Sequence, residues 1–226
     1  MEIKRYEGGA LTYLCVEPDD YTQDRPYPLV VLLHGYGSHM GDLAGLCQAI
    51  DGRKYLYALP NAPIPLQIGP GTVGYAWADP PESGSVEAAV ERLEAFFESV
   101  VDRYAVEPGR AVLGGFSQGG MVTYQWGLPN PDLFLGLVVL SSKVLDRGIL
   151  MERLPVDRAQ SVFVAHGTTD SMISVQDARE SREFLKTQGY TPEYREYEMG
   201  HEINQDVLAD VVPWIHRILG DGGELA

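Results

Sequence analysis

The chain has 226 residues, of which 45% are apolar and 22% charged, a composition typical of a single soluble α/β domain. No apolar run approaches the ~20 residues that a membrane-spanning helix needs, and the first twenty residues lack the apolar core of a secretory signal. A formal net charge of −15 disfavours phosphate backbones and anionic lipid surfaces as partners. We therefore expect a cytoplasmic protein that binds no nucleic acid and does not associate stably with membranes.

Short strand-like runs alternate with helical patterns along the chain. The first 16 residues are typical of an antiparallel edge strand or hairpin. The expected strands that follow are 28–34, 54–60, 110–116, 133–142, 161–167 and 191–199, and the expected helices are 42–50, 85–104, 175–188 and 203–219. This alternation predicts a mostly parallel central sheet with helices on both faces. We expect one domain over residues 1–220 and a frayed tail at 221–226.

One segment, residues 60–84, interrupts the alternation. It is rich in proline and glycine, and a loop of this length inside a compact domain is usually functional or wrongly assigned. Its apolar side chains suit an acyl-chain site and a plain core role equally well: Ile64, Leu66, Ile68, Tyr75 and Trp77. Elsewhere, Cys15 and Cys47 lie among apolar neighbours without metal-ligand spacing, so we expect buried thiols and no metal.

The stretch 112-VLGGFSQGGMVT-123 places Ser117 between Gly115 and Gly119, where an expected strand turns directly into a helical pattern. The G-x-S-x-G pattern is a weak signal alone, but at such a junction it predicts a nucleophile elbow. A Cβ atom at either glycine is expected to collide with the opposite wall of the turn. The N–H of Gln118, at the start of the helix, points where an oxyanion would form. A glycine-rich turn with an idle serine is the alternative.

A nucleophilic serine needs a base, and the base needs an orienting group. Parallel strands bring the groups that follow their carboxyl ends to one edge of the sheet. Asp170 follows the run 161–167, and His201 follows the run 191–199. The order Ser117, Asp170, His201 is that of an α/β-hydrolase triad.

Other histidines and aspartates fit this role less well. His34, His39 and His166 precede Asp170 and break the expected order, and His216 is expected to face solvent on the last helix. The competing aspartates lie in a connecting segment or at a helix start: Asp146, Asp157 and Asp177.

A second oxyanion donor is expected after an early strand, where HGYG follows the run 28–34. Gly35 and Gly37 allow a tight turn, and the N–H of Tyr36 is expected to face Ser117. An ordinary glycine-containing turn is the alternative.

Six segments in order over residues 31–203 resemble the phospholipase/carboxylesterase family of α/β-hydrolases, which includes acyl-protein thioesterases and small bacterial carboxylesterases. They are LLHGYG, LPNAP, YAWAD, GGFSQGG, HGTTDSMI and GHEI. The resemblance implies the α/β-hydrolase fold, with Ser117 as nucleophile, Asp170 as orienting acid and His201 as base. It also implies that the backbone N–H groups of Tyr36 and Gln118 bind the oxyanion.

The same resemblance implies that Trp77 lies near the acyl pocket and Met172 on its rim. The sequence departs from the family pattern at Tyr36, where leucine is common, at Ser171, where proline is usual, and in the segment SKVLDRGIL at 142–150. These departures leave the three triad residues unchanged.

The expected function is hydrolysis of carboxylic esters with short to medium acyl chains through an acyl-enzyme, without a metal or cofactor. Activity on acyl-thioesters or lysophospholipids is an alternative, and a non-catalytic ligand-binding protein of the same fold is a more distant one. The expected partner is a small-molecule ester, and either a monomer or a homodimer is compatible with the sequence.

Overall fold

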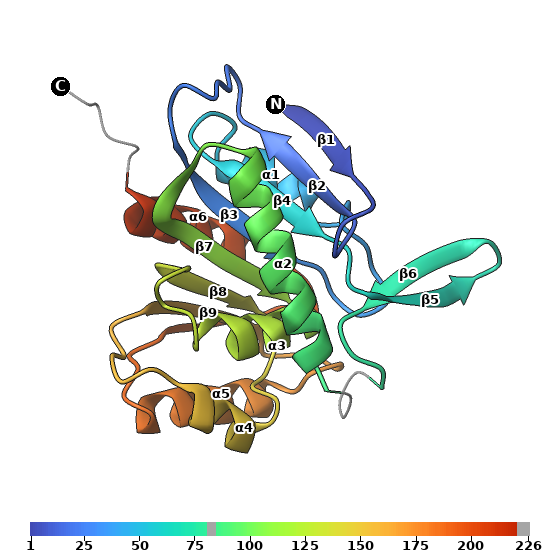
Figure 1. Cartoon of the computed structure of the whole chain (residues 1–226). Helices are drawn as coiled ribbons and strands as arrows, with labels where there is room; N and C mark the ends of the chain where they lie inside the picture. The colour runs from blue at the N-terminus through green and yellow to red at the C-terminus, as the bar shows by residue number, and fades with distance from the viewer. Residues whose placement is uncertain (81–84, 221–226) are drawn as a thin grey trace.

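The computed structural model describes residues 1–80 and 85–220. Within these residues, one sheet holds eight strands in the order β1-β2-β4-β3-β7-β8-β9-β10 (Figure 1). Its strands are β1 (Glu2–Tyr6), β2 (Tyr13–Glu17), β3 (Tyr27–Leu33), β4 (Leu56–Pro60), β7 (Val106–Phe116), β8 (Gly136–Leu140), β9 (Ser161–Gly167) and β10 (Glu193–Tyr197). The pairs β1–β2 and β2–β4 are antiparallel, and the other neighbours are parallel. The predicted mostly parallel α/β sheet and its N-terminal hairpin are thus confirmed.

Helices cover both faces of this sheet. They are α1 (Ala44–Ile50), α2 (Glu87–Arg103), α3 (Gln118–Val122), α4 (Arg147–Arg153), α5 (Val175–Thr187) and α6 (Gln205–Leu219), with a π-helical turn, η1 (Thr123–Gly127), after α3. In Figure 1, α2 crosses in front of the sheet and α6 lies behind it. On α2 the buried residues recur every three or four positions, as a helix with one apolar face requires.

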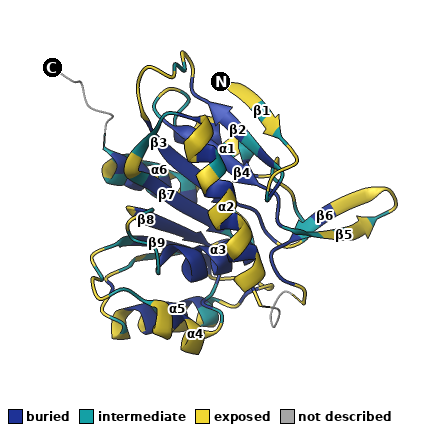
Figure 2. Cartoon of the chain, in the orientation of Figure 1, coloured by how far each residue is buried: buried dark blue, intermediate teal, exposed yellow. Residues whose placement is uncertain are grey.

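Strand β3 shows why the central runs are continuously apolar. Its residues Leu29 and Val31 belong to the core cluster that includes Leu93 of α2, whereas Val30 belongs to the cluster that includes Val211 of α6. Successive side chains of a strand point to opposite faces, so a strand covered on both sides must be apolar throughout. Figure 2 shows the central strands buried and α2 partly exposed on its outer side.

The segment after β4 is not a structureless loop. Residues Ile64–Gly69 form β5 and Thr72–Ala76 form β6, an antiparallel hairpin that projects from the body of the molecule (Figure 1). Ile68 and Val73 are exposed, whereas Trp77, just after β6, is buried in the core. Proline and glycine within the hairpin hid its strand pattern in the sequence. Residues 81–84 lie outside the described ranges, as does the predicted tail at 221–226.

One helix was not expected from the sequence, and one further expectation holds only in part. The connecting segment after β8 contains a short helix, α4, which is capped by the Asp146 carboxylate accepting from the N–H of Ile149 at 3.1 Å. The prediction that His216 faces solvent holds only in part: its side chain is 30% exposed, but its Nε2 lies 3.1 Å from the carbonyl oxygen of Ile50, and its ring packs against Tyr55. Helix α6 therefore uses His216 to contact the end of α1.

The predicted burial of both cysteines is confirmed. Cys15 and Cys47 are buried free thiols, and burial raises the pKa of each to about 12. Among the described helices, none has the length and apolarity needed to cross a membrane.

Candidate active site

The turn between β7 and α3 consists of a single residue, Ser117. The strand ends at Phe116 and the helix begins at Gln118, so Ser117 takes φ 55° and ψ −120°, a conformation that non-glycine residues rarely adopt. The end of β8 holds this turn: the N–H of Ser117 donates to Leu140 O at 2.9 Å, and its carbonyl accepts from Ser142 Oγ at 2.7 Å. Hydrogen bonds to the end of the neighbouring strand therefore hold Ser117 in its unfavourable backbone conformation.

The two glycines around Ser117 are required by close backbone approach. A Cβ atom at Gly115 would lie 2.3 Å from the backbone of Gly119. A Cβ atom at Gly119 would lie 2.2 Å from the carbonyl oxygen of Leu33 on β3. The first contact is within the turn, as expected from the sequence, whereas the second is with the adjacent strand. Both distances are too short for any side chain, so this turn excludes every residue except glycine at the two positions.

Ser117, His201 and Asp170 lie in one hydrogen-bonded line. His201 Nε2 is 2.9 Å from Ser117 Oγ, and His201 Nδ1 is 2.7 Å from Asp170 Oδ2. The three residues follow β7, β10 and β9 at the carboxyl edge of the sheet. The Asp170 side chain is fully buried, and 18% of the His201 side chain is exposed. The geometry suits a neutral imidazole that donates from Nδ1 to the carboxylate and accepts the serine proton at Nε2.

The Asp170 carboxylate is fixed by its own loop. Its Oδ1 accepts from the backbone N–H groups of Met172 at 2.8 Å and Ile173 at 3.0 Å. The fully buried His166 donates from Nε2 to Ile173 O at 2.8 Å and lies 3.5 Å from Asp170 Oδ2. His166 precedes Asp170, so the expected order of the triad excludes it as the base. Its place at the end of a strand, four residues before Asp170, is nevertheless a signal for this supporting contact.

The loop after β3 lies directly against Ser117. A Cβ atom at Gly35 would lie 3.3 Å from the Cβ atom of Ser117. The loop is anchored to the β5–β6 hairpin, because Gly37 N donates to Tyr75 O at 2.9 Å and Tyr75 N donates to Ser38 O at 2.8 Å. Within the described residues, no backbone carbonyl accepts from the N–H of Tyr36. The oxyanion role of this N–H stays a prediction.

Gln118 contributes more than a backbone N–H, a role that the sequence did not reveal. Its buried side chain accepts from Trp77 N at 2.8 Å and donates to Ala78 O at 2.7 Å, and Trp77 Nε1 donates to His34 O at 2.8 Å. Trp77 is only 1% exposed. It belongs to the core cluster behind the Ser117 turn, and its predicted contact with an acyl chain stays a prediction. Met172 is 71% exposed, and its place on a pocket rim likewise stays a prediction.

His34 is a buried neutral histidine beneath the same loop. It donates from Nδ1 to Gly35 O at 2.7 Å and accepts at Nε2 from Ala62 N at 3.0 Å. Burial lowers the pKa of His34 to about 4. The ring therefore holds the loop in position and remains uncharged near neutral pH.

Comparison with known proteins agrees with this geometry. The model of the Phospholipase/Carboxylesterase family matches residues 20–219. Among curated relatives, acyl-protein thioesterase 1 of Mycosarcoma maydis is 26% identical, with 86% of this chain and 92% of the relative covered. Carboxylesterase SOBER1 of Arabidopsis thaliana is 28% identical, and the match covers 72% of this chain and 77% of that protein.

Solved structures agree as well. The crystal structure of Arabidopsis thaliana SOBER1 gives a TM-score of 0.72 at 26% identity, covering 86% of this chain and all of that one. A carboxylesterase from Mesorhizobium loti, at 19% identity, shares the fold with a TM-score of 0.78, covering 95% and 99% of the two chains. Since the family model spans most of the sequence, this chain belongs to the phospholipase/carboxylesterase family of α/β-hydrolases and is an esterase-type hydrolase.

Proposed function

We propose that the protein hydrolyses carboxylic esters through an acyl-enzyme, with Ser117 as nucleophile, His201 as base and acid, and Asp170 as orienting group. The observation that carries this proposal is the hydrogen-bonded line of the three side chains, at 2.9 Å and 2.7 Å. A serine hydroxyl is a weak nucleophile until such a base removes its proton.

The reaction proceeds in two halves. His201 takes the Ser117 proton as the hydroxyl oxygen attacks the ester carbonyl, and the N–H groups of Tyr36 and Gln118 stabilise the oxyanion. His201 then gives that proton to the leaving alcohol, and the acyl group remains on Ser117. In the second half, water loses a proton to His201 as its oxygen attacks the acyl carbonyl. His201 then returns that proton to Ser117 Oγ as the acyl–serine bond breaks and the acid leaves. The base must be neutral, so the rate is expected to fall in acid.

We assign the activity to short and medium acyl chains. The segment between β4 and α2 carries a two-stranded hairpin, β5–β6, in its described part, and its base supports the loop beside Ser117. Ile64 and Leu66 of this hairpin are half-buried and supply modest apolar surface.

A second candidate is hydrolysis of acyl-thioesters. The same three residues support that chemistry, and several relatives at 26% to 28% identity are named acyl-protein thioesterase 1. Lysophospholipid hydrolysis, suggested by the family description, is a variant of the same ester chemistry.

Replacing Ser117 by alanine tests the assignment. We expect Ser117→Ala to lower the rate on p-nitrophenyl butyrate by about 10⁴-fold or more, while the circular-dichroism spectrum is retained. Ser161→Ala, at the opposite end of the sheet, is the matched control. Retention of the wild-type rate in Ser117→Ala would refute the nucleophile.

A chain-length series then separates the two candidates. Nitrophenyl esters and matched acyl-thioesters with acyl chains of about two to sixteen carbons are compared by kcat/KM. A maximum for esters at about four to eight carbons supports the first candidate. A preference for thioesters at equal chain length replaces it with the second. A maximum for the longest ester chains overturns the assignment to short and medium acyl chains.

A further inference from the structure

An open groove lies beside His201, between the start of α1 and the loop after β10. It encloses about 680 Å³, part of it open to solvent. Apolar side chains of Leu46, Phe116 and Ile203 line it, and its charged side chains are Asp42 and Glu202. Within the described residues, no lysine or arginine lines the groove. It therefore combines apolar contact surface with negative charge.

The chemistry of the proposed reaction decides which part of an ester this groove can hold. His201 must deliver its proton to the leaving oxygen, so the alcohol part of the ester must lie on the His201 side of Ser117. His201 and the next two residues form one wall of the groove. The Phe116 ring, 4.8 Å from the imidazole, continues the surface from the reacting atoms into the groove.

The backbone beneath both carboxylates is held in place. The N–H of Asp42 donates to His39 O at 3.0 Å, and Ser141 Oγ lies 3.4 Å from the carbonyl oxygen of Glu202. Ser141 itself has a φ of 47°, at the carboxyl end of β8. Both carboxylate-bearing residues are exposed, and both line the groove.

We propose that this groove is the subsite for the alcohol part of the ester and that it favours alcohols with an ammonium group on an apolar stem. The proposal rests on the proposed esterase function and deepens it. The apolar stem contacts Leu46 and Ile203, and the cation lies near the Phe116 ring and between the two carboxylates. An anionic alcohol is disfavoured by the same charges.

The charge preference is tested with a pair of esters of nearly equal shape. Butyrylcholine carries a quaternary nitrogen, and 3,3-dimethylbutyl butyrate carries carbon at the same position. We expect the wild-type protein to favour the choline ester by about fivefold in kcat/KM, with the preference shrinking in about 0.5 M salt. The double variant Asp42→Asn/Glu202→Gln is expected to lose most of this preference.

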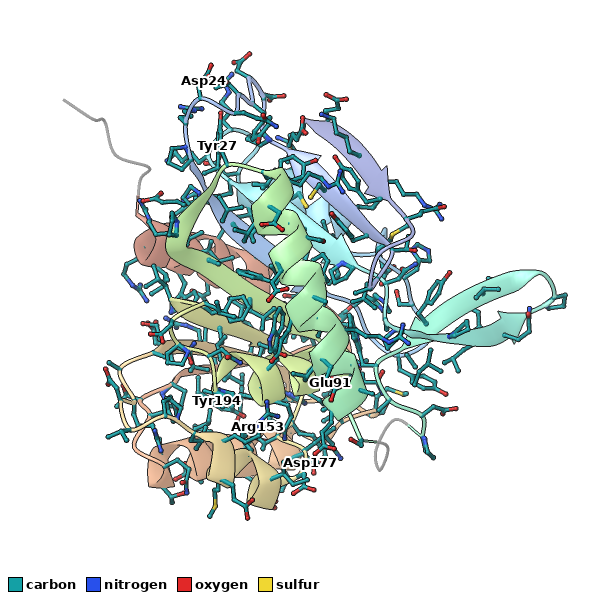
Figure 3. All side chains as sticks on the ribbon, viewed as in Figure 1. Asp24, Tyr27, Glu91, Arg153, Asp177 and Tyr194 are labelled. Carbon is teal, nitrogen blue, oxygen red and sulfur yellow. The ribbon has the colours of Figure 1, made fainter. Side chains whose placement is uncertain are left out.

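A matched control removes the same charge elsewhere. Glu91→Gln/Glu94→Gln alters two exposed carboxylates on α2, on the other face of the sheet, and Glu91 is labelled in Figure 3. It is expected to keep the wild-type ratio. Because each ratio compares two substrates in one preparation, it does not depend on the fraction of folded protein. A ratio unchanged in Asp42→Asn/Glu202→Gln, or lowered equally by the α2 variant, overturns the proposal.

A bulky substitution in the groove tests whether the alcohol part or the acyl part of the ester lies there. A Cβ atom at Gly45, which also lines the groove, meets no atom within 4 Å, so Gly45→Trp fits the backbone. We expect the benzyl-to-methyl ratio of kcat/KM, at a constant acyl group, to fall at least about fivefold, and the octanoyl-to-acetyl ratio to stay constant. A fall in the acyl ratio instead, or no change in either, overturns the assignment. All these outcomes require an active esterase, so they are distinct from failure of the Ser117 proposal.

Discussion

Gln118 illustrates how much depends on one residue. Its backbone N–H begins α3 next to Ser117, and its side-chain amide binds Trp77 and Ala78, some 40 positions earlier in the chain. An amide is the side chain that satisfies both partners, because it donates to one and accepts from the other. The turn that carries Ser117 and the segment that follows β6 are therefore held together by one buried group.

A nearly isosteric substitution tests this bridge. Gln118→Glu keeps the acceptor for Trp77 N–H but cannot donate to Ala78 O as a carboxylate, and the charge is buried. We expect the free energy of unfolding to fall by about 2 kcal/mol or more, measured by urea titration. The control is Gln205→Glu at the exposed start of α6, where an acidic residue is favourable. Equal stability of Gln118→Glu and wild type would contradict the bridge.

At the scale of elements, the site depends on links between strand ends. His34 directly follows β3, and its ring accepts from the N–H of Ala62, just after β4. This bond joins the two neighbouring strands beyond the end of their backbone pairing. The same ring binds Gly35 O, in the loop that faces Ser117. A protonated ring has no lone pair to accept from Ala62, so this link requires the neutral form.

The link predicts a loss of stability in acid. The pKa of His34 is about 4 in the folded protein, below its ordinary value of 6.5. Between these values the unfolded chain binds a proton that the folded chain does not, so stability falls as pH falls through this window. The full loss is about 3 kcal/mol, complete near pH 4, and is absent above pH 6.5.

Unfolding free energies from pH 7 to 4 check this prediction. His34→Gln is expected to be less stable at pH 7 but to show a shallower decline with acid than the wild type. Carboxylates also titrate in this range, and subtracting the variant's curve from that of the wild type removes their contribution. Parallel curves for wild type and His34→Gln would contradict the buried neutral ring.

At the scale of the whole molecule, the sheet explains which features the sequence could predict. Alternating strand and helix patterns give the carboxyl edge of a parallel sheet, and residues directly after strand ends must gather there. Ser117, Asp170 and His201 satisfy that condition, so their proximity followed from local patterns. The fold and the membership of the family are confirmed.

Other features depend on contacts that no local pattern encodes. The side chains of Gln118 and Trp77 meet only after folding, and the groove forms where α1 approaches the loop that carries His201. The strands of the β5–β6 hairpin were not predicted because they are short and contain proline and glycine. Helix α4 was not predicted because it is short and lies in a polar segment. Residues in such places are positioned by the tertiary structure.

The most direct test of the whole account is the site and rate of labelling by a fluorophosphonate, which forms a covalent bond only with an activated serine. Peptide mass spectrometry of the labelled protein is predicted to place the adduct on Ser117. His201→Gln is predicted to slow labelling by about 10³-fold or more, because the base that accepts the serine proton is gone. An adduct on another residue, or equal labelling rates in wild type and His201→Gln, would contradict the catalytic line of Ser117, His201 and Asp170.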